Sequence, residues 1–156
     1  MQAKLNPPPR FLVPPVQTLL WLGGGYLAHR VLGFPDDCRP LPLAIAGWLL
    51  VALGIGLIGW AIRHFRRAKT SEMPWLVPTA FVANGPYLVT RNPMYLGMAL
   101  ILLGFATVRS SPPMLLAPAG FMLSVTLTWI RFEEAVLARR FGKSYLAYRS
   151  RVSRWL

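Results

Sequence analysis

Two adjacent glutamates, Glu133 and Glu134, are the clearest candidates for chemistry in this chain of 156 residues. They follow an apolar segment and fall about one helical turn beyond its end. On a helix, Glu134 shares a stripe with Ile130, Leu137, Phe141 and Tyr145, so its carboxylate lies on an apolar face. A carboxylate in such a position is costly unless a cation pairs with it. The pair therefore either neutralises basic residues near the headgroups or holds a cationic ligand.

A second motif, RNPMYLG, occupies residues 91–97. Asparagine is a favoured N-cap and proline is favoured at the first helical position, so we expect a helix to begin at Pro93 with Asn92 as its cap. The free backbone N–H groups of that helix, with Arg91 beside them, would suit an anion such as a carboxylate. The same spacing also fits an ordinary helix start. The cation that Glu134 requires could be Arg91, another basic residue or a ligand.

Four apolar segments position these motifs, at about residues 11–32, 41–62, 93–108 and 113–130. The charged fraction is only 14%, whereas a soluble domain usually has about 25%. A bilayer core of ~30 Å is crossed by roughly 20 apolar residues. The sequence therefore predicts an all-α membrane protein, a single domain over residues 1–156 with about four transmembrane helices. The last two should form a tight hairpin, followed by a C-terminal cytoplasmic helical segment.

The basic residues indicate the orientation of these helices. Fourteen of the 17 lysines and arginines lie before the first apolar segment, between the second and third, or after the fourth. By the positive-inside rule, both termini, the middle loop and the Glu133–Glu134 site face the cytoplasm. Because the basic residues flank apolar segments and form no single soluble face, we expect no nucleic-acid binding.

Glycines and prolines predict the breaks between these elements. Residues 63–69 should continue the second helix, after which Pro74, Pro78 and Gly85-Pro86 end it, leaving an apolar loop against the membrane. Gly142 is a candidate helix C-cap.

After that cap we expect a short amphipathic helix, with Tyr145, Tyr148, Val152 and Trp155 as interfacial anchors.

Two further patterns indicate structure and not a ligand site. The GxGxxG pattern at Gly54, Gly56 and Gly59 lies inside an uncharged apolar segment, so it predicts close helix packing through small residues. The single cysteine, Cys38, is read as an ordinary loop residue. The two histidines have no neighbours with metal-ligand spacing, and we expect no metal site.

The motifs together resemble a known family. Residues 85–87 (GPY), 91–97, 133–134 and 141–149 (FGKSYLAYR) have an order and spacing similar to the isoprenylcysteine carboxyl methyltransferase and phospholipid methyltransferase superfamily. The similarity covers residues 81–156. It implies an integral membrane enzyme that uses S-adenosylmethionine. The positions that it assigns to the cofactor site are Tyr87, Arg91, Asn92, Pro93, Tyr95, Gly97, Glu133 and Glu134.

The resemblance implies methyl transfer to a lipophilic acceptor that enters from the bilayer, while the cofactor enters from the cytoplasm. The first expectation is O-methylation of an isoprenylcysteine-type carboxylate. The alternatives are a phospholipid amine, a small thiol, or a non-catalytic membrane scaffold with the same fold. Better-known eukaryotic members have histidine at the position of Asn92, so no imidazole role is carried over, and no residue is assigned to activation of the acceptor.

Overall fold

The computed structural model describes residues 7–35, 40–73, 75–76 and 78–156, and all regular structure within them is helical. The predicted all-α class is therefore confirmed. The predictions made for Cys38 and for the helix break at Pro74 lie outside the described residues.

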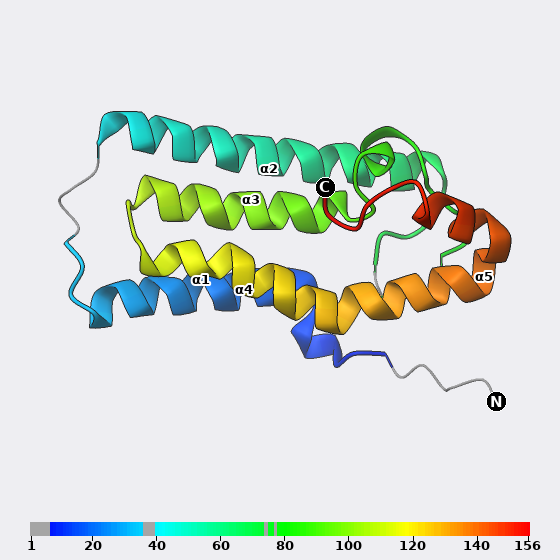
Figure 1. Cartoon of the computed structure of the whole chain (residues 1–156), viewed down its shortest axis with the longest axis horizontal. Coiled ribbons are helices and arrows are strands. Elements are labelled where there is room, and N and C mark those ends of the chain that lie inside the picture. Colours follow the sequence, from blue (N-terminus) through cyan, green and yellow to red (C-terminus); the bar gives the residue numbers. More distant parts are fainter. Residues whose placement is uncertain (1–6, 36–39, 74, 77) are drawn as a thin grey trace.

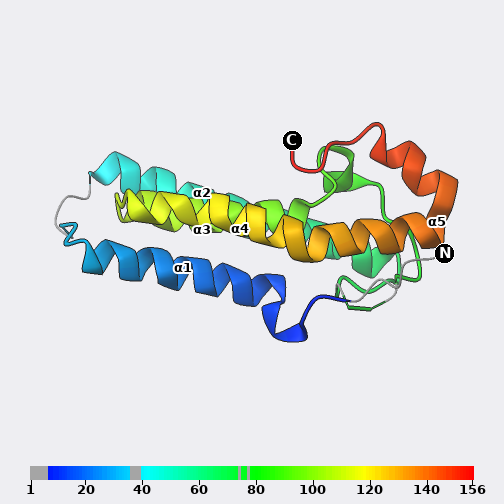
Figure 2. The same cartoon turned by 60° about the horizontal axis from the view of Figure 1, so that its bottom comes forward.

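Four long helical segments lie side by side (Figures 1 and 2). They are α1 (Pro14–Val31), α2 (Leu41–Arg67), α3 (Pro93–Val108), and the run of η3 (Pro113–Leu115), α4 (Leu116–Val125), η4 (Thr126–Ile130) and α5 (Arg131–Arg149). The contacts join α2 to α3, α3 to α4 and α1 to α4. As predicted, α3 begins at Pro93, and α2 continues past residue 62 into its basic end.

Two helices are long and apolar enough to cross a bilayer, namely Leu41–Arg67 and the helical run Pro113–Arg149, while Pro93–Val108 is apolar but shorter. Large apolar side chains of α2, among them Leu49, Leu53 and Ile55, are exposed, as expected for a surface that contacts lipid. Up to the break at Gly142, residues 113–141 of the second helix would extend about 44 Å, more than the ~30 Å of hydrocarbon. Its charged part, α5, must therefore project beyond the apolar layer. Four crossings remain a prediction.

Paired glycines bring α2 and α3 into backbone contact. A Cβ atom at Gly47 would lie 2.6 Å from the carbonyl oxygen of Gly104, and one at Gly54 would lie 2.5 Å from that of Gly97. The prediction of close packing through small residues is thus confirmed at Gly54. It is wrong at Gly56 and Gly59, where a Cβ atom would meet no atom within 4 Å, because these two glycines face away from α3.

A π-helical turn, η4, connects α4 to α5 and is fixed by the N-terminal part of the chain. The indole N–H of Trp129 donates to the carbonyl of Leu12, at 2.6 Å. The buried amide of Gln17 donates to the Thr128 hydroxyl at 3.1 Å and accepts a bond from Ser124 at 2.8 Å. A π turn shifts the register of everything that follows it. This turn therefore helps set the direction in which α5 presents its glutamates.

The chain reverses after Gly142, where φ is +48° inside α5. The predicted helix break at Gly142 is confirmed, because this left-handed conformation suits glycine. The predicted interfacial role of Tyr145 and Tyr148 is wrong: both are buried, because the reversal turns them inward against Phe81 and Val82.

The interfacial positions of the loop and of Val152 and Trp155 stay predictions, and the structure adds contacts within the protein. Val152 and Trp155 are half-buried and pack against apolar clusters of the same domain. Trp75, from the loop expected against the membrane, packs edge-on against Trp129. The loop is therefore held by contacts with α5 and η4.

The glycine contacts predict that adding a methyl group changes the stability in opposite directions at two positions of α2. Gly54→Ala should lower the free energy of unfolding by about 2 kcal/mol, because the new methyl overlaps the α3 backbone. Gly56→Ala should leave it unchanged or raise it by up to ~1 kcal/mol, because alanine favours helix more than glycine does. Thermal unfolding in detergent, followed by circular dichroism, measures both. Equal effects would contradict the packing described.

Candidate active site

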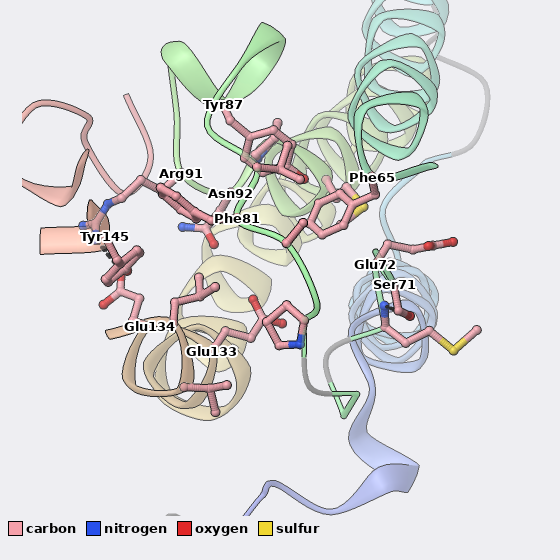
Figure 3. A pocket seen from close by; sticks show the side chains of 18 of the residues that line it. Phe65, Ser71, Glu72, Phe81, Tyr87, Arg91, Asn92, Glu133, Glu134 and Tyr145 are labelled. Atoms are coloured by element: carbon pink, nitrogen blue, oxygen red, sulfur yellow. Dashed lines mark hydrogen bonds and ion pairs between the residues drawn. The ribbon is translucent and has the colours of Figure 1, made fainter. Parts of the chain in front are cut away.

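A cavity of about 870 Å³, counted with its open mouth, lies where α3 begins and α5 starts. Figure 3 shows Arg91, Glu134 and Tyr145 on one side of it and Phe65, Ser71 and Glu72 on the other. Seven of the eight residues predicted for a cofactor site line this cavity: Tyr87, Arg91, Asn92, Pro93, Tyr95, Glu133 and Glu134.

The carboxylate of Glu134 is held between two guanidinium groups. Its Oε1 lies 3.0 Å from Nη1 of Arg91, and the side chains of Arg91 and Glu134 are each only 11% exposed. Arg154 donates from Nη2 to Oε2 at 2.7 Å and from Nε to Oε1 at 3.0 Å. Arg91 is therefore one of the cations that pair with Glu134, as considered from the sequence. Arg154 is the second, and the sequence did not indicate it. Two positive charges on one carboxylate leave this side of the cavity positive.

Glu133 has a different environment, although it is the next residue. Its Oε1 accepts a hydrogen bond from the hydroxyl of Tyr95 on α3. Desolvation raises the pKa of the Glu133 carboxyl to about 7, with the bond from Tyr95 opposing the rise and the charge of Glu134 adding to it. Because its pKa lies near 7, the Glu133 carboxyl can change its charge near neutral pH.

The start of α3 differs from the prediction in one detail. Asn92 precedes the helix but makes no capping bond with its side chain. Its amide Nδ2 donates instead to the carbonyl of Arg154, at 2.9 Å. Asn92 therefore occupies the predicted N-cap position, but the predicted capping bond is absent, because this more distant carbonyl takes the side-chain amide. No side chain within the described residues caps the first N–H groups of α3, which leaves them able to meet an anion.

Two buried polar atoms at the cavity lack a partner among the described residues: the hydroxyl of Tyr87 and Nε of Arg91. Tyr87 is 6% exposed, and its own carbonyl accepts a bond from the Tyr148 hydroxyl at 2.7 Å. Burial, with a smaller effect of Glu133, raises the pKa of the Tyr87 phenol, so this group stays protonated. A buried hydroxyl without a partner is costly, and a ligand in the cavity would relieve that cost.

Gly97 is the one predicted residue that does not line the cavity. It faces α2, where a Cβ atom would lie 2.7 Å from the carbonyl oxygen of Gly54. Its role in this structure is to let α3 approach α2.

Several lining residues were not predicted. The cavity is also lined by Phe65, Glu72, Phe81, Tyr145 and Tyr148. Tyr145 belongs to the predicted Glu134 stripe, but the break at Gly142 interrupts that helix, so the stripe does not explain its place at the cavity. Glu72 and Phe81 lie in a loop without periodicity. Within the part of the chain that the structure describes, no group of three or more His, Cys, Asp or Glu residues is placed to hold a metal ion.

The different environments of the two glutamates predict different costs of neutralising them. Glu134→Gln should lower the free energy of unfolding by about 2–3 kcal/mol, because it leaves two guanidiniums without their shared carboxylate. Glu133→Gln should cost less than ~1 kcal/mol, because an amide oxygen still accepts the bond from Tyr95. Thermal unfolding of the two variants in one detergent gives the comparison. A larger loss in Glu133→Gln would contradict this electrostatic arrangement.

Comparison with known proteins identifies the family. The family model described as phospholipid methyltransferase matches residues 43–144, which include all eight predicted site residues. No curated protein and no solved structure matches the chain. The resemblance seen in the motifs is confirmed by this match, which covers more than half of the chain. With two helices able to cross a membrane and a cavity built from the family-like motifs, the chain belongs to the phospholipid methyltransferase family.

Proposed function

We propose that this protein transfers a methyl group from S-adenosylmethionine to a lipophilic acceptor at the cytoplasmic surface of a membrane. The observation that carries the proposal is the cavity, which collects seven predicted cofactor residues around buried polar atoms that lack partners. The family match supports methyl transfer.

The residues at the cavity suit the chemical groups of this cofactor. Glu133 would pair with the α-ammonium, because Glu134 is already neutralised by two arginines. The Arg91 guanidinium and the uncapped N-terminus of α3 would hold the carboxylate. The Tyr87 hydroxyl would bond a polar atom of the nucleoside. The rings of Phe65 and Phe81 offer apolar faces and attraction for a cation.

When bound, the cofactor supplies an electrophilic methyl group carried on a sulfonium. The protein's contribution would be to align acceptor and donor and to keep water away. The apolar lining from the 71–82 loop, including Met73, Leu76 and Phe81, would exclude water from the site.

We further propose that all four long helical segments cross the membrane and that the cavity faces the cytoplasm. The basic end of α2 and the charged helix α5 lie at the same end of the molecule (Figure 1). This is the arrangement that the positive-inside rule favours for a cytoplasmic face. The acceptor would then reach the cavity from the bilayer, and the cofactor from the cytoplasm.

The acceptor that we propose first is a lipophilic carboxylate of the isoprenylcysteine type, on the strength of the motif resemblance. A phospholipid amine is the second candidate. An amine must lose a proton on methylation, and we assign no residue to that step, because Glu133 would be paired with the ammonium of the cofactor.

Incubation with methyl-labelled cofactor and membrane extract, followed by base, separates these acceptors. Base releases methanol from a methyl ester but leaves N-methyl and S-methyl groups intact. Cofactor binding without transfer to any extract would favour the scaffold alternative.

Binding of S-adenosylhomocysteine to the purified protein tests the cofactor site. Calorimetry should detect binding to the wild type and about tenfold weaker binding to Tyr87→Phe, because the ligand then loses one hydrogen bond. The melting temperature without ligand should not fall in this variant, because the removed hydroxyl has no partner there. Tyr26→Phe, an exposed tyrosine on α1, is the matched control and should bind as the wild type does. Absence of binding to the wild type at millimolar ligand would refute the proposal.

Binding should also weaken as the pH falls. Glu133 has a raised pKa of about 7, so below that pH it is protonated and must lose its proton before it can pair with the ammonium. Between pH 8 and pH 6 the dissociation constant of S-adenosylhomocysteine should therefore rise about tenfold. In Glu133→Gln the dissociation constant at pH 8 should be higher than that of the wild type, and it should change little between pH 8 and pH 6. A pH-independent wild-type constant would exclude Glu133 as the ammonium partner.

A further inference from the structure

We infer that Ser153 and Arg154, in the segment 150–156 that follows α5, form part of the cofactor site, and that Arg154 is the positioning residue that holds Arg91 and Asn92 at the cavity. The inference rests on the proposed function for the identity of the ligand. This segment lies beyond residues 43–144, the range matched by the family model.

The backbone of this segment binds the three consecutive residues that precede α3, Thr90, Arg91 and Asn92. The amide of Arg91 donates to the Ser153 carbonyl at 3.0 Å. The Thr90 hydroxyl donates to the Arg154 carbonyl at 3.0 Å, and the side-chain amide of Asn92 donates to the same carbonyl at 2.9 Å. Thr90 and Asn92 are buried, so water does not replace these bonds readily. The position of the motif thus depends on residues about sixty positions away.

The side chain of Arg154 acts on Arg91 through Glu134. It binds both carboxylate oxygens in the two-pronged geometry that fixes the plane of the carboxylate. Oε1 of Glu134 is then shared with Arg91, 3.0 Å away. Without Arg154, the carboxylate could rotate, and it could compete with Glu133 for a cationic ligand. Arg154 therefore both orients Arg91 and keeps Glu134 occupied.

The segment is itself fixed at both of its ends. The amides of Arg151 and Val152 each donate to the carbonyl of Tyr148 at 3.0 Å, and Tyr148 is tied to Tyr87 by its hydroxyl. Beyond Arg154, Trp155 packs against the core cluster that contains Trp129. In Figure 1 the chain after α5 returns to the beginning of α3. The segment therefore crosses the charged side of the cavity and is held in place at both ends.

Substitution of Arg154, compared with Arg151, tests the inference. Arg151 is exposed and donates to the Ala147 carbonyl at the end of α5, so Arg151→Gln is a matched control on the same segment. Arg154→Gln should raise the dissociation constant of S-adenosylhomocysteine about tenfold, whereas Arg151→Gln should change it less than about twofold. Arg154→Lys restores the charge but not the two-pronged geometry, so its constant should lie between those of wild type and Arg154→Gln.

A double substitution separates positioning from general stability. In a Glu134→Gln background, Arg154→Gln should add little further loss of affinity, because Arg154 acts through Glu134. Full additivity of the two losses, or equal constants for Arg154→Gln and Arg151→Gln, would overturn the inference.

Hydrogen–deuterium exchange of residues 88–96 without ligand provides a measurement that does not depend on the cofactor. Exchange at the Arg91 amide should be faster in Arg154→Gln than in wild type and unchanged in Arg151→Gln. If the wild type binds no S-adenosylhomocysteine, the proposed function fails, and this exchange still decides whether Arg154 positions the motif. Equal exchange in all three proteins would overturn that role.

Discussion

The Glu134 carboxylate, held between Arg91 and Arg154, is the interaction on which the site depends. Each of the three charges lies on a different part of the chain: α5, the start of α3 and the segment after α5. A carboxylate this deeply buried is stable only with partners, and the partners are stable only with the carboxylate. The triad therefore connects elements that the helix packing alone would leave free to shift, and it gives one side of the cavity a fixed positive potential.

The apolar bundle serves this triad by fixing where α3 and α5 begin. Glycine contacts between α2 and α3 set the height of the RNPMYLG motif. The π turn and its bonds to Leu12 set the rotation of α5. Both constraints act along rigid helices, so a cavity at their ends is precise even though its far wall is a loop.

Local patterns predicted the helical class, the start of α3 at Pro93, the extension of α2 and the break at Gly142. Each of these is determined by residues close in sequence: a proline, a run of basic residues or a glycine. Arg154 was not predicted, because its partner is twenty residues away across a chain reversal and leaves no periodic signal. The same reason explains Asn92: its side chain was expected to act locally, but a carbonyl from a distant segment competed successfully.

The projection of α5 beyond the apolar layer has a consequence for kinetics. With the proposed topology, one reactant would be dissolved in three dimensions and the other in two. The rate would then respond to the mole fraction of acceptor in the surrounding lipid and not to its amount per volume of suspension. Diluting the acceptor with inert lipid would slow turnover even when the total quantity of acceptor is unchanged. The turnover rate would thus depend on lateral diffusion of the acceptor in the bilayer and on the lipid composition of the bilayer.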